Sequence, residues 1–242
     1  MVTYRIRPIA LCQGPRDGAH FGYCADFGAS NTGCYIWFLE GPGPKVLVDA
    51  GAKAVSFKGM GATETDLISV EDGLGKLGLK PHDIDIVIVT HLHCDHIELG
   101  HLYKKARFIV QKKELDYARN PHPIDAVGFI KDTFEGLNFE VIDGDREIIP
   151  GISVLLTPGH TAGGQSVEVN TTAGRAIIAG FCGVANNFTP NATSKRMGWE
   201  VTAPLIHHDV RQAYDSVLRV KQRADIIIAL HDPAFINRTA IP

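Results

Sequence analysis

The chain lacks a long apolar run, a strong excess of charge and a charged-then-apolar leader. No apolar stretch approaches the roughly 20 residues that cross a bilayer, so neither a membrane span nor a membrane partner is expected. A net charge of −3 and a pI near 6.4 provide no basic surface, so nucleic acid is not expected as a partner. The absence of a leader argues against secretion.

The chain also lacks a CxxC pair, and its cysteines are few and irregularly spaced. The five are Cys12, Cys24, Cys34, Cys94 and Cys182. An odd number in a chain of this size argues against a disulfide framework, and the missing CxxC argues against a zinc ribbon. We therefore expect a reducing, cytoplasmic setting.

No internal repeat, low-complexity tract or linker divides the chain, so residues 1–242 are expected to form a single domain. Its apolar runs alternate between strand-like and helix-like patterns, with the turn signal "GPGP" joining the first two strands in a hairpin. The expected strands are 34–40, 45–51, 83–90, 107–110, 139–143, 152–157, 165–169, 175–180 and 225–230, and the expected helices are 69–79, 111–120 and 208–223. This alternation indicates a layered α/β fold.

Metal-binding residue types crowd into the stretch "VIVTHLHCDHIELGH". Of the 11 histidines in the chain, three fall within positions 91–96. They follow a β-branched apolar run, and imidazoles placed there are typical of a metal site rather than of a solvated surface. Side chains alternate along an extended segment, so His91, His93 and Asp95 are expected to point one way, with His96 turning in afterwards.

Two later segments repeat the order of an apolar strand followed by a ligand. They are "ISVLLTPGHT", which places His160, and "DIIIALHDP", which places His231. Each histidine taken alone is as readily structural as functional. Together with the first cluster they complete a mononuclear or dinuclear hydrolytic site, for which Zn²⁺ is the expected ion and Fe²⁺ or Mn²⁺ remain open.

The motifs "VLVDAG", "THLHCDH", "TPGHT" and "LHDP", in this order, closely resemble the metallo-β-lactamase superfamily. The stretch "TPGHTAGGQSV" and the chain length make the sequence most similar to the N-acyl homoserine lactonase-type branch. This resemblance implies a four-layer αββα sandwich, in which two mixed β-sheets are flanked by helices and a metal site lies at one edge of the sheets.

The resemblance also implies two ligand sets. They are His91, His93 and His160 for one ion, and Asp95, His96 and His231 for the second. Asp49 of "VLVDAG" matches the family's aspartate that orients a ligand histidine through its free ring N–H. The alternative for Asp49 is a turn aspartate before Gly51.

The chain departs from the family at "RAIIAGFCGVANNF". The family's bridging aspartate falls on Phe181, which cannot bind a metal, while its neighbour Cys182 can. We hypothesise that a local shift brings Cys182 into the site; the alternative is a buried cysteine acting as a small hydrophobe. Without a Cys182 ligand, the protein would work with one ion or with iron. The family's substrate-contacting tyrosine falls on Val184.

Several polar side chains near these motifs have less certain roles. Strand alternation points Cys94 away from the ligands, and His101 is expected outside the site. Four residues remain unranked as replacements for the missing tyrosine: Tyr23, Tyr35, His207 and His208, of which the two histidines are more simply explained as preceding a helix N-cap at Asp209.

The expected chemistry is hydrolysis by a metal-bound hydroxide, with Asp95 carrying the proton to the leaving group. An ester-type leaving group needs little acid assistance, so opening of a small lactone is the leading hypothesis. The alternatives are a cyclic amide hydrolase or aminohydrolase, an iron-dependent redox enzyme, and a non-catalytic metal-binding protein. A small-molecule substrate is expected in a pocket formed by residues 14–33, 51–65 and 184–208, and a homo-oligomer is left open.

Overall fold

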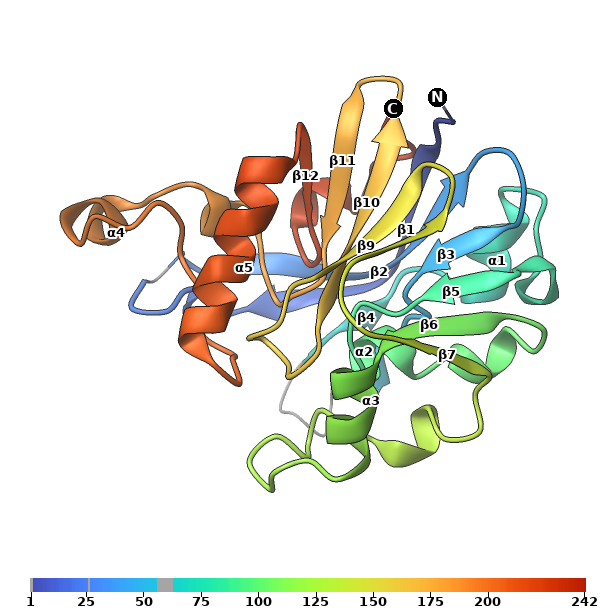
Figure 1. Cartoon of the computed structure of the whole chain (residues 1–242), viewed down its shortest axis with the longest axis horizontal. Coiled ribbons are helices and arrows are strands. Elements are labelled where there is room, and N and C mark those ends of the chain that lie inside the picture. The colour runs from blue at the N-terminus through green and yellow to red at the C-terminus, as the bar shows by residue number, and fades with distance from the viewer. Residues whose placement is uncertain (1, 26, 56–62) are drawn as a thin grey trace.

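Two β-sheets packed face to face form the centre of the molecule (Figure 1). The structure is a computed structural model and describes residues 2–25, 27–55 and 63–242. The first sheet has the order β4-β1-β2-β3-β5-β6-β7 and consists of β1 (Arg5–Arg16), β2 (Ser30–Glu40), β3 (Val46–Val48), β4 (Thr65–Asp66), β5 (Ile86–Ile88), β6 (Arg107–Gln111) and β7 (Phe139–Ile142). The second has the order β12-β11-β10-β9-β8 and consists of β8 (Arg146–Ile149), β9 (Ile152–Leu156), β10 (Gln165–Thr171), β11 (Gly174–Ala179) and β12 (Ile226–Ala229).

Both sheets are mixed. In the first, β1, β2 and β3 pair antiparallel, whereas β3, β5, β6 and β7 pair parallel. In the second, β11 and β12 are parallel and the remaining pairs are antiparallel. Parallel strands deliver their carboxyl ends to the same edge, so side chains that follow β5 and its neighbours come together there.

Helices cover the outer face of each sheet. They are α1 (Val70–Gly75), α2 (Cys94–Ile97), α3 (Lys112–Arg119) and α5 (Val210–Arg223), whereas α4 (Ala192–Arg196) lies on a loop away from the sheets (Figure 1). Apolar residues of α1, α2 and α3 pack on the first sheet, and Val217 and Val220 of α5 pack on the second. Figure 1 shows α5 on one side of the paired sheets and α1 to α3 on the other. The expected αββα sandwich is confirmed.

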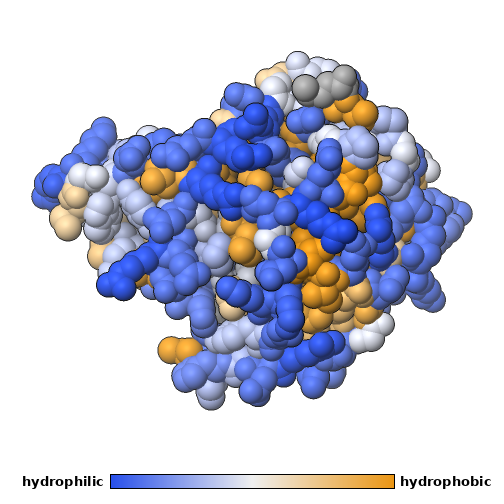
Figure 2. All heavy atoms as spheres, in the orientation of Figure 1, coloured by the Kyte–Doolittle hydropathy of each residue, from blue (hydrophilic) through white to orange (hydrophobic). Residues whose placement is uncertain are grey.

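The main core lies between the two sheets. It brings Trp37 and Ile88 of the first sheet together with Val167 and Ile178 of the second, all of them fully buried. Removing this apolar surface from water supplies the main force that holds the sheets together. The surface seen in Figure 2 is mostly polar and is interrupted by smaller apolar areas.

The local predictions hold for the hairpin and for the helix starts. Strands β2 and β3 pair antiparallel with Trp37 opposite Val48, and the Ser69 and Asp209 side chains cap α1 and α5. The expected strands 45–51 and 83–90 are shorter in the structure, as β3 and β5. The chain leaves β3 at Asp49, whose φ of 60° is incompatible with a strand.

The first strand of the structure, β1, was missed by the sequence analysis. It carries prolines at positions 8 and 15 and arginines at 5, 7 and 16, which disguise its apolar alternation. It nevertheless pairs along its length with β2. Among the described residues, no helix combines the length and apolarity that crossing a bilayer requires.

The packing between the sheets leads to a stability prediction. Ile178→Ala removes a fully buried side chain from the main core, and we expect a loss of about 2–5 kcal/mol in the free energy of unfolding. Ile124→Ala serves as the matched control because Ile124 is 78% exposed, and it should change stability by less than about 0.5 kcal/mol. Denaturant titration measures both, and equal effects would contradict the assignment of the core.

Candidate metal centre

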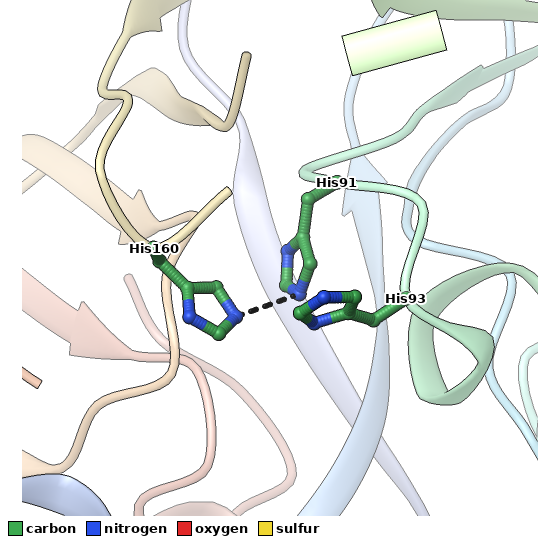
Figure 3. A group of neighbouring side chains, drawn as sticks. All are labelled: His91, His93 and His160. Carbon is green, nitrogen blue, oxygen red and sulfur yellow. Dashed lines mark hydrogen bonds between the residues drawn. The ribbon is translucent and has the colours of Figure 1, made fainter. Parts of the chain in front are cut away.

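The histidines of the three motifs converge at one edge of the paired sheets. His91 and His93 follow β5 of the first sheet, whereas His160 and His231 follow β9 and β12 of the second. Figure 3 shows His91 and His93 on one loop facing His160 on another. The ligand atoms of these three histidines lie within 4.8 Å of one another.

Asp95 and His96 form a second group, which shares His91. Their ligand atoms and that of His91 also lie within 4.8 Å of one another. The expected reason for this placement was wrong: Cys94–Ile97 is the short helix α2, with His93 as its N-cap residue, and not a continued extended segment. The helical turn brings Asp95 and His96 back toward the strand end.

Hydrogen bonds fix the tautomers of three histidines. The Nδ1 of His160 lies 2.7 Å from the Ile206 carbonyl oxygen, and the Nδ1 of His231 lies 3.0 Å from that of Gly33. A carbonyl oxygen can only accept, so each Nδ1 donates, and each neutral ring keeps its lone pair on Nε2. The Nδ1 of His96 donates in the same way to Asp49 Oδ2, at 2.9 Å.

The same reasoning applies to His91. The Thr90 hydroxyl donates to Asp49 Oδ2 at 2.9 Å, so its oxygen accepts from His91 Nδ1 at 3.1 Å. The lone pair of His91 Nε2 then faces that of His160 Nε2 at 3.2 Å, the contact drawn in Figure 3. Two lone pairs at this distance repel each other unless a proton or a cation lies between them.

His96 also has a ring nitrogen that lacks a hydrogen-bond partner. Its Nε2 is buried and has no hydrogen bond, although Asp95 Oδ2 lies 3.1 Å away. His231 Nε2 lies 3.7 Å from the same oxygen. A carboxylate and inward-facing imidazole lone pairs are the donor set of a divalent transition-metal ion, so the residues present fit such an ion.

Burial and charge set the protonation of these groups. Burial, assisted by the neighbouring imidazoles, lowers the pKa of His91 and His160 well below the ordinary value. Burial also lowers the pKa of His93 and His231 to about 4. These four rings are therefore neutral at pH 7, as metal ligation requires.

In the Asp95 and His96 pair, by contrast, the surroundings favour the charged form of each group. Burial disfavours both charges, but the carboxylates of Asp95 and Asp49 outweigh it and raise the pKa of His96 to about 10. Burial opposes ionisation of Asp95 too, yet the imidazoles of His96 and His231 hold the pKa of Asp95 far below its usual range. Asp95 is thus an ionised carboxylate, and a proton or another cation is favoured at His96.

Asp49 is fully buried and accepts three hydrogen bonds. They come from the backbone N–H of Thr90 at 2.7 Å, from its hydroxyl, and from His96 Nδ1. Asp49 therefore fixes the ring of His96 directly and that of His91 through Thr90. The resemblance implied a contact from Asp49 to the ring N–H of a ligand histidine without specifying which one, and in the structure its partner is His96.

A sequence profile of the metallo-beta-lactamase superfamily matches residues 30–231. The chain belongs to this superfamily. An N-acyl homoserine lactonase of Bacillus thuringiensis is 29% identical over 218 residues, which cover 82% of this chain and 80% of the relative. A probable metallo-hydrolase of Methanocaldococcus jannaschii is 40% identical over 160 residues, which cover 66% of this chain and 63% of the relative.

Solved structures share the same architecture. A mutant of B. thuringiensis AiiA with N-decanoyl-L-homoserine bound at the active site has a TM-score of 0.75 at 24% identity, covering 97% of this chain and 95% of that chain. AidC, a dizinc quorum-quenching lactonase in complex with a product, has a TM-score of 0.67 at 15% identity, covering 99% and 92%. At these identities the likeness shows the metallo-beta-lactamase fold.

Within this superfamily fold, a buried carboxylate joins the two histidine loops. Glu114 of α3 accepts the backbone N–H of Leu92 at 2.9 Å through one oxygen and that of Gly163 at 2.9 Å through the other. Leu92 lies between His91 and His93, and Gly163 lies in the loop that follows His160. Burial raises the pKa of Glu114, whereas these N–H groups counter the rise.

A buried glutamine adds a second link between the sheets. The Gln165 side chain donates to the Val89 carbonyl oxygen at 2.7 Å. The Gln165 backbone N–H donates to the Thr90 carbonyl oxygen at 2.8 Å. Glu114 and Gln165 were both missed by the sequence analysis. Nothing in the local pattern distinguishes Glu114 from an exposed helical glutamate, because its partners are backbone groups distant in sequence.

The two residues at the bridging position have different surroundings. Phe181 packs into the apolar cluster beneath α5, whereas Cys182 lines the pocket together with His231 and Asp95. Burial, with help from the charge of Asp95, raises the pKa of the Cys182 thiol to about 12. Cys182 and His231 both lie outside the two ligand groups defined by the 4.8 Å limit.

The structure shows which of the side chains with uncertain roles lie outside the candidate site. Cys94 is buried on α2 and belongs to neither ligand group, and His101 is exposed in a 3₁₀ turn, where its Nε2 lies 3.3 Å from the Asp132 carbonyl oxygen. Tyr35 is buried in the main core and donates to the Asp232 carbonyl at 2.7 Å. It therefore cannot reach a substrate.

Of the remaining candidates for the missing tyrosine, His207 and His208 line the pocket, while Tyr23 packs edge-on against His207. The pocket includes residues of 14–33, as expected, whereas of the expected 184–208 only Ile206, His207 and His208 line it. Of 51–65, Glu64 lines the pocket, and 56–62 lie outside the described residues. A wall formed by residues 117–129 was not anticipated.

The Glu114 contacts lead to a prediction about the histidine loops. Glu114→Gln replaces one acceptor oxygen by an NH₂ group that faces a backbone donor, so we expect a loss of about 1–3 kcal/mol of stability. Hydrogen exchange at the Leu92 and Gly163 amides should accelerate selectively. The control is Glu98→Gln, because Glu98 accepts a single backbone N–H, from Lys53 at 2.9 Å, at an exposed site. Unchanged exchange at both amides in Glu114→Gln would contradict the link.

Proposed function

We propose that this protein is a metal-dependent hydrolase that opens the ring of a lactone, with N-acyl homoserine lactones as the substrate class. The observation that carries this proposal is the convergence of His91, His93 and His160, with the Nε2 lone pairs of His91 and His160 only 3.2 Å apart, beside the ionised Asp95. The likeness to N-acyl homoserine lactonases supports the choice of bond. A related structure holds the product N-hexanoyl-L-homoserine at its catalytic metal centre, which also supports it.

The proposed ligand sets are the two expected from the sequence. His91, His93 and His160 would hold one ion, and Asp95, His96 and His231 would hold a second. Zn²⁺ suits this mixture of imidazole and carboxylate, although Fe²⁺ or Mn²⁺ would be accepted by the same donors. When bound, such an ion lowers the pKa of a coordinated water from 15.7 toward about 7 and polarises a carbonyl oxygen.

The side chains of the chain account for the movement of the proton. Hydrolysis adds the water oxygen to the lactone carbonyl carbon, breaks the ring C–O bond and leaves a carboxylate and an alcohol. The ring oxygen therefore needs a proton as it departs. Asp95 lies at the centre of the site with a carboxylate that can accept the water proton and pass it to that oxygen. An alcohol leaves more readily than an amine, which favours lactones over cyclic amides.

Cys182 is proposed as a further ligand, in place of the bridging aspartate. A thiolate would supply the negative charge that Phe181 cannot. Cys182 lines the same pocket as Asp95 and His231, which supports this role. All five cysteines are free thiols, in keeping with the cytoplasmic setting that we propose.

Metal removal tests the proposed function. Turnover of N-hexanoyl homoserine lactone should be lost after treatment with a chelator and restored by Zn²⁺. His160→Gln should reduce the metal content measured by mass spectrometry, whereas His101→Gln, the control outside the site, should not. Turnover that survives complete metal removal would overturn the proposal. Faster hydrolysis of a cyclic amide than of the lactone would replace the lactone by the cyclic amide as the proposed substrate.

Asp95 gives a separate prediction about the chemical step. In Asp95→Asn loaded to the metal content of the wild type, we expect kcat to fall by about 10²–10⁴-fold because the proton carrier is lost. Lactones with a more acidic alcohol need less proton donation, so the defect should shrink for them. A kcat that stays at the wild-type value in the fully loaded variant would exclude this role.

Cys182 is tested by metal stoichiometry. Cys182→Ala should retain fewer ions than the wild type, and Cys182→Asp, which restores the family's carboxylate one residue later, should recover them. Cys12→Ala is the control, since that thiol is buried and does not line the pocket. Full occupancy in Cys182→Ala would show that Cys182 is merely a small buried side chain.

A further inference from the structure

The described residues that line the pocket include three carboxylates, Glu64, Asp95 and Asp125. The first two face cationic or ligand-type partners: Glu64 pairs with Arg16, and Asp95 lies between the imidazoles of the metal centre. Asp125 differs because its direct hydrogen-bond partner is a neutral phenol. Tyr117 donates its O–H to Asp125 Oδ2, while His208 Nδ1 lies 3.9 Å from that oxygen.

Asp125 is held rigidly beside the metal centre. Its carbonyl oxygen accepts the Gly128 N–H at 3.0 Å, and the Gly128 carbonyl in turn accepts the Cys94 N–H of α2 at 2.8 Å. The Tyr117 ring packs on Phe129, whose ring lies 4.7 Å from that of His93. A Cβ added at Gly128 would lie 2.7 Å from the His93 ring, so the loop that carries Asp125 approaches this histidine closely.

Beyond Asp125 the pocket wall becomes apolar and opens to solvent. Ile124, Val127 and Ile206 line it and are 78%, 61% and 43% exposed. Exposed branched side chains that rim a pocket are typical of a ligand-binding surface. The same pocket therefore offers a ligand both a hydrogen-bond acceptor, Asp125, and apolar side chains that are open to solvent.

We propose that Asp125 accepts a hydrogen bond from the amide N–H of an N-acylated lactone, with Tyr117 fixing the carboxylate and the acyl chain lying on the apolar rim. This inference rests on the proposed lactonase function and assigns the residue that recognises the amide. A carboxylate acceptor forms a stronger hydrogen bond than a neutral one, and it also repels anionic substituents. Tyr117 acts through Asp125 and is a positioning residue.

The test compares two substrates that differ in one atom. N-hexanoyl homoserine lactone carries an amide N–H beside the ring, and α-hexanoyloxy-γ-butyrolactone carries an ester oxygen at that place. The readout is the ratio of their kcat/KM values in each protein, because intrinsic differences in reactivity cancel between proteins. Relative to the wild type, we expect the ratio of amide to ester to fall about tenfold or more in Asp125→Ala and less in Asp125→Asn.

Two further variants sharpen the comparison. Tyr117→Phe should lower the ratio, mainly through KM of the amide, because the carboxylate loses its fixed orientation. Asp116→Asn is the matched control, since Asp116 is an exposed aspartate of α3 paired with Lys112, and its ratio should equal that of the wild type. Metal content is measured in every variant because Asp125 lies near His93.

The outcomes separate this inference from the proposed function. A wild-type ratio retained in Asp125→Ala would overturn the role of Asp125 while leaving the lactonase intact. If neither lactone is hydrolysed, the proposed function fails, and calorimetric binding of the two compounds replaces kinetics. Tighter binding of the amide that disappears in Asp125→Ala would still support the recognition site, and equal binding of both compounds would reject it.

Discussion

The site depends on the direction in which each buried imidazole carries its proton. Backbone carbonyls hold the Nδ1–H of His160 and His231, and Asp49 holds that of His96 directly and that of His91 through Thr90. These contacts occupy the Nδ1 atoms and leave the Nε2 atoms of His91 and His160 facing each other at 3.2 Å. Such an arrangement is unfavourable unless a cation occupies the space between them. Binding of an ion therefore offsets the free-energy cost of this arrangement in the folded state.

The two-sheet architecture makes this arrangement possible. The histidines of the candidate site follow strands in both sheets, so the site is assembled only when the sheets are packed together through their common core. Glu114 joins the loop after β5 to the loop after β9 by accepting a backbone N–H from each. Gln165, at the start of β10, adds a hydrogen bond to the backbone that follows β5. Rigid strand ends supply the precision, and the longer loops around them are free to shape the pocket for a substrate.

Much of the fold, and the gathering of the histidines at one edge of the sheets, could be predicted from the sequence because local signals mark the strand ends. Apolar runs that end in His91, His160 and His231 mark strand tips, and capping residues mark the starts of α1 and α5. The other elements of the site depend on contacts between distant segments. Glu114 bonds to backbone groups, and Asp125 is placed by a loop with no regular pattern. The helical turn at α2 could not be separated from an extended segment either, since four residues are too few to show a period.

The missing bridging aspartate shows the limit of transferring a family pattern. Alignment alone places Phe181 in the site, whereas packing turns that ring into the apolar layer under α5 and presents Cys182 to the pocket. Side-chain size decides the matter, because a phenyl ring gains far more than a thiol from burial in that layer.

Anomalous X-ray diffraction from crystals of the protein grown with Zn²⁺ would test the central claim most directly. The account predicts a zinc peak bonded to the Nε2 atoms of His91 and His160, with the Nδ1 contacts to Thr90 and Ile206 retained. A zinc peak bound through Nδ1, or crystals in which these imidazoles hold no ion at saturating zinc, would contradict it.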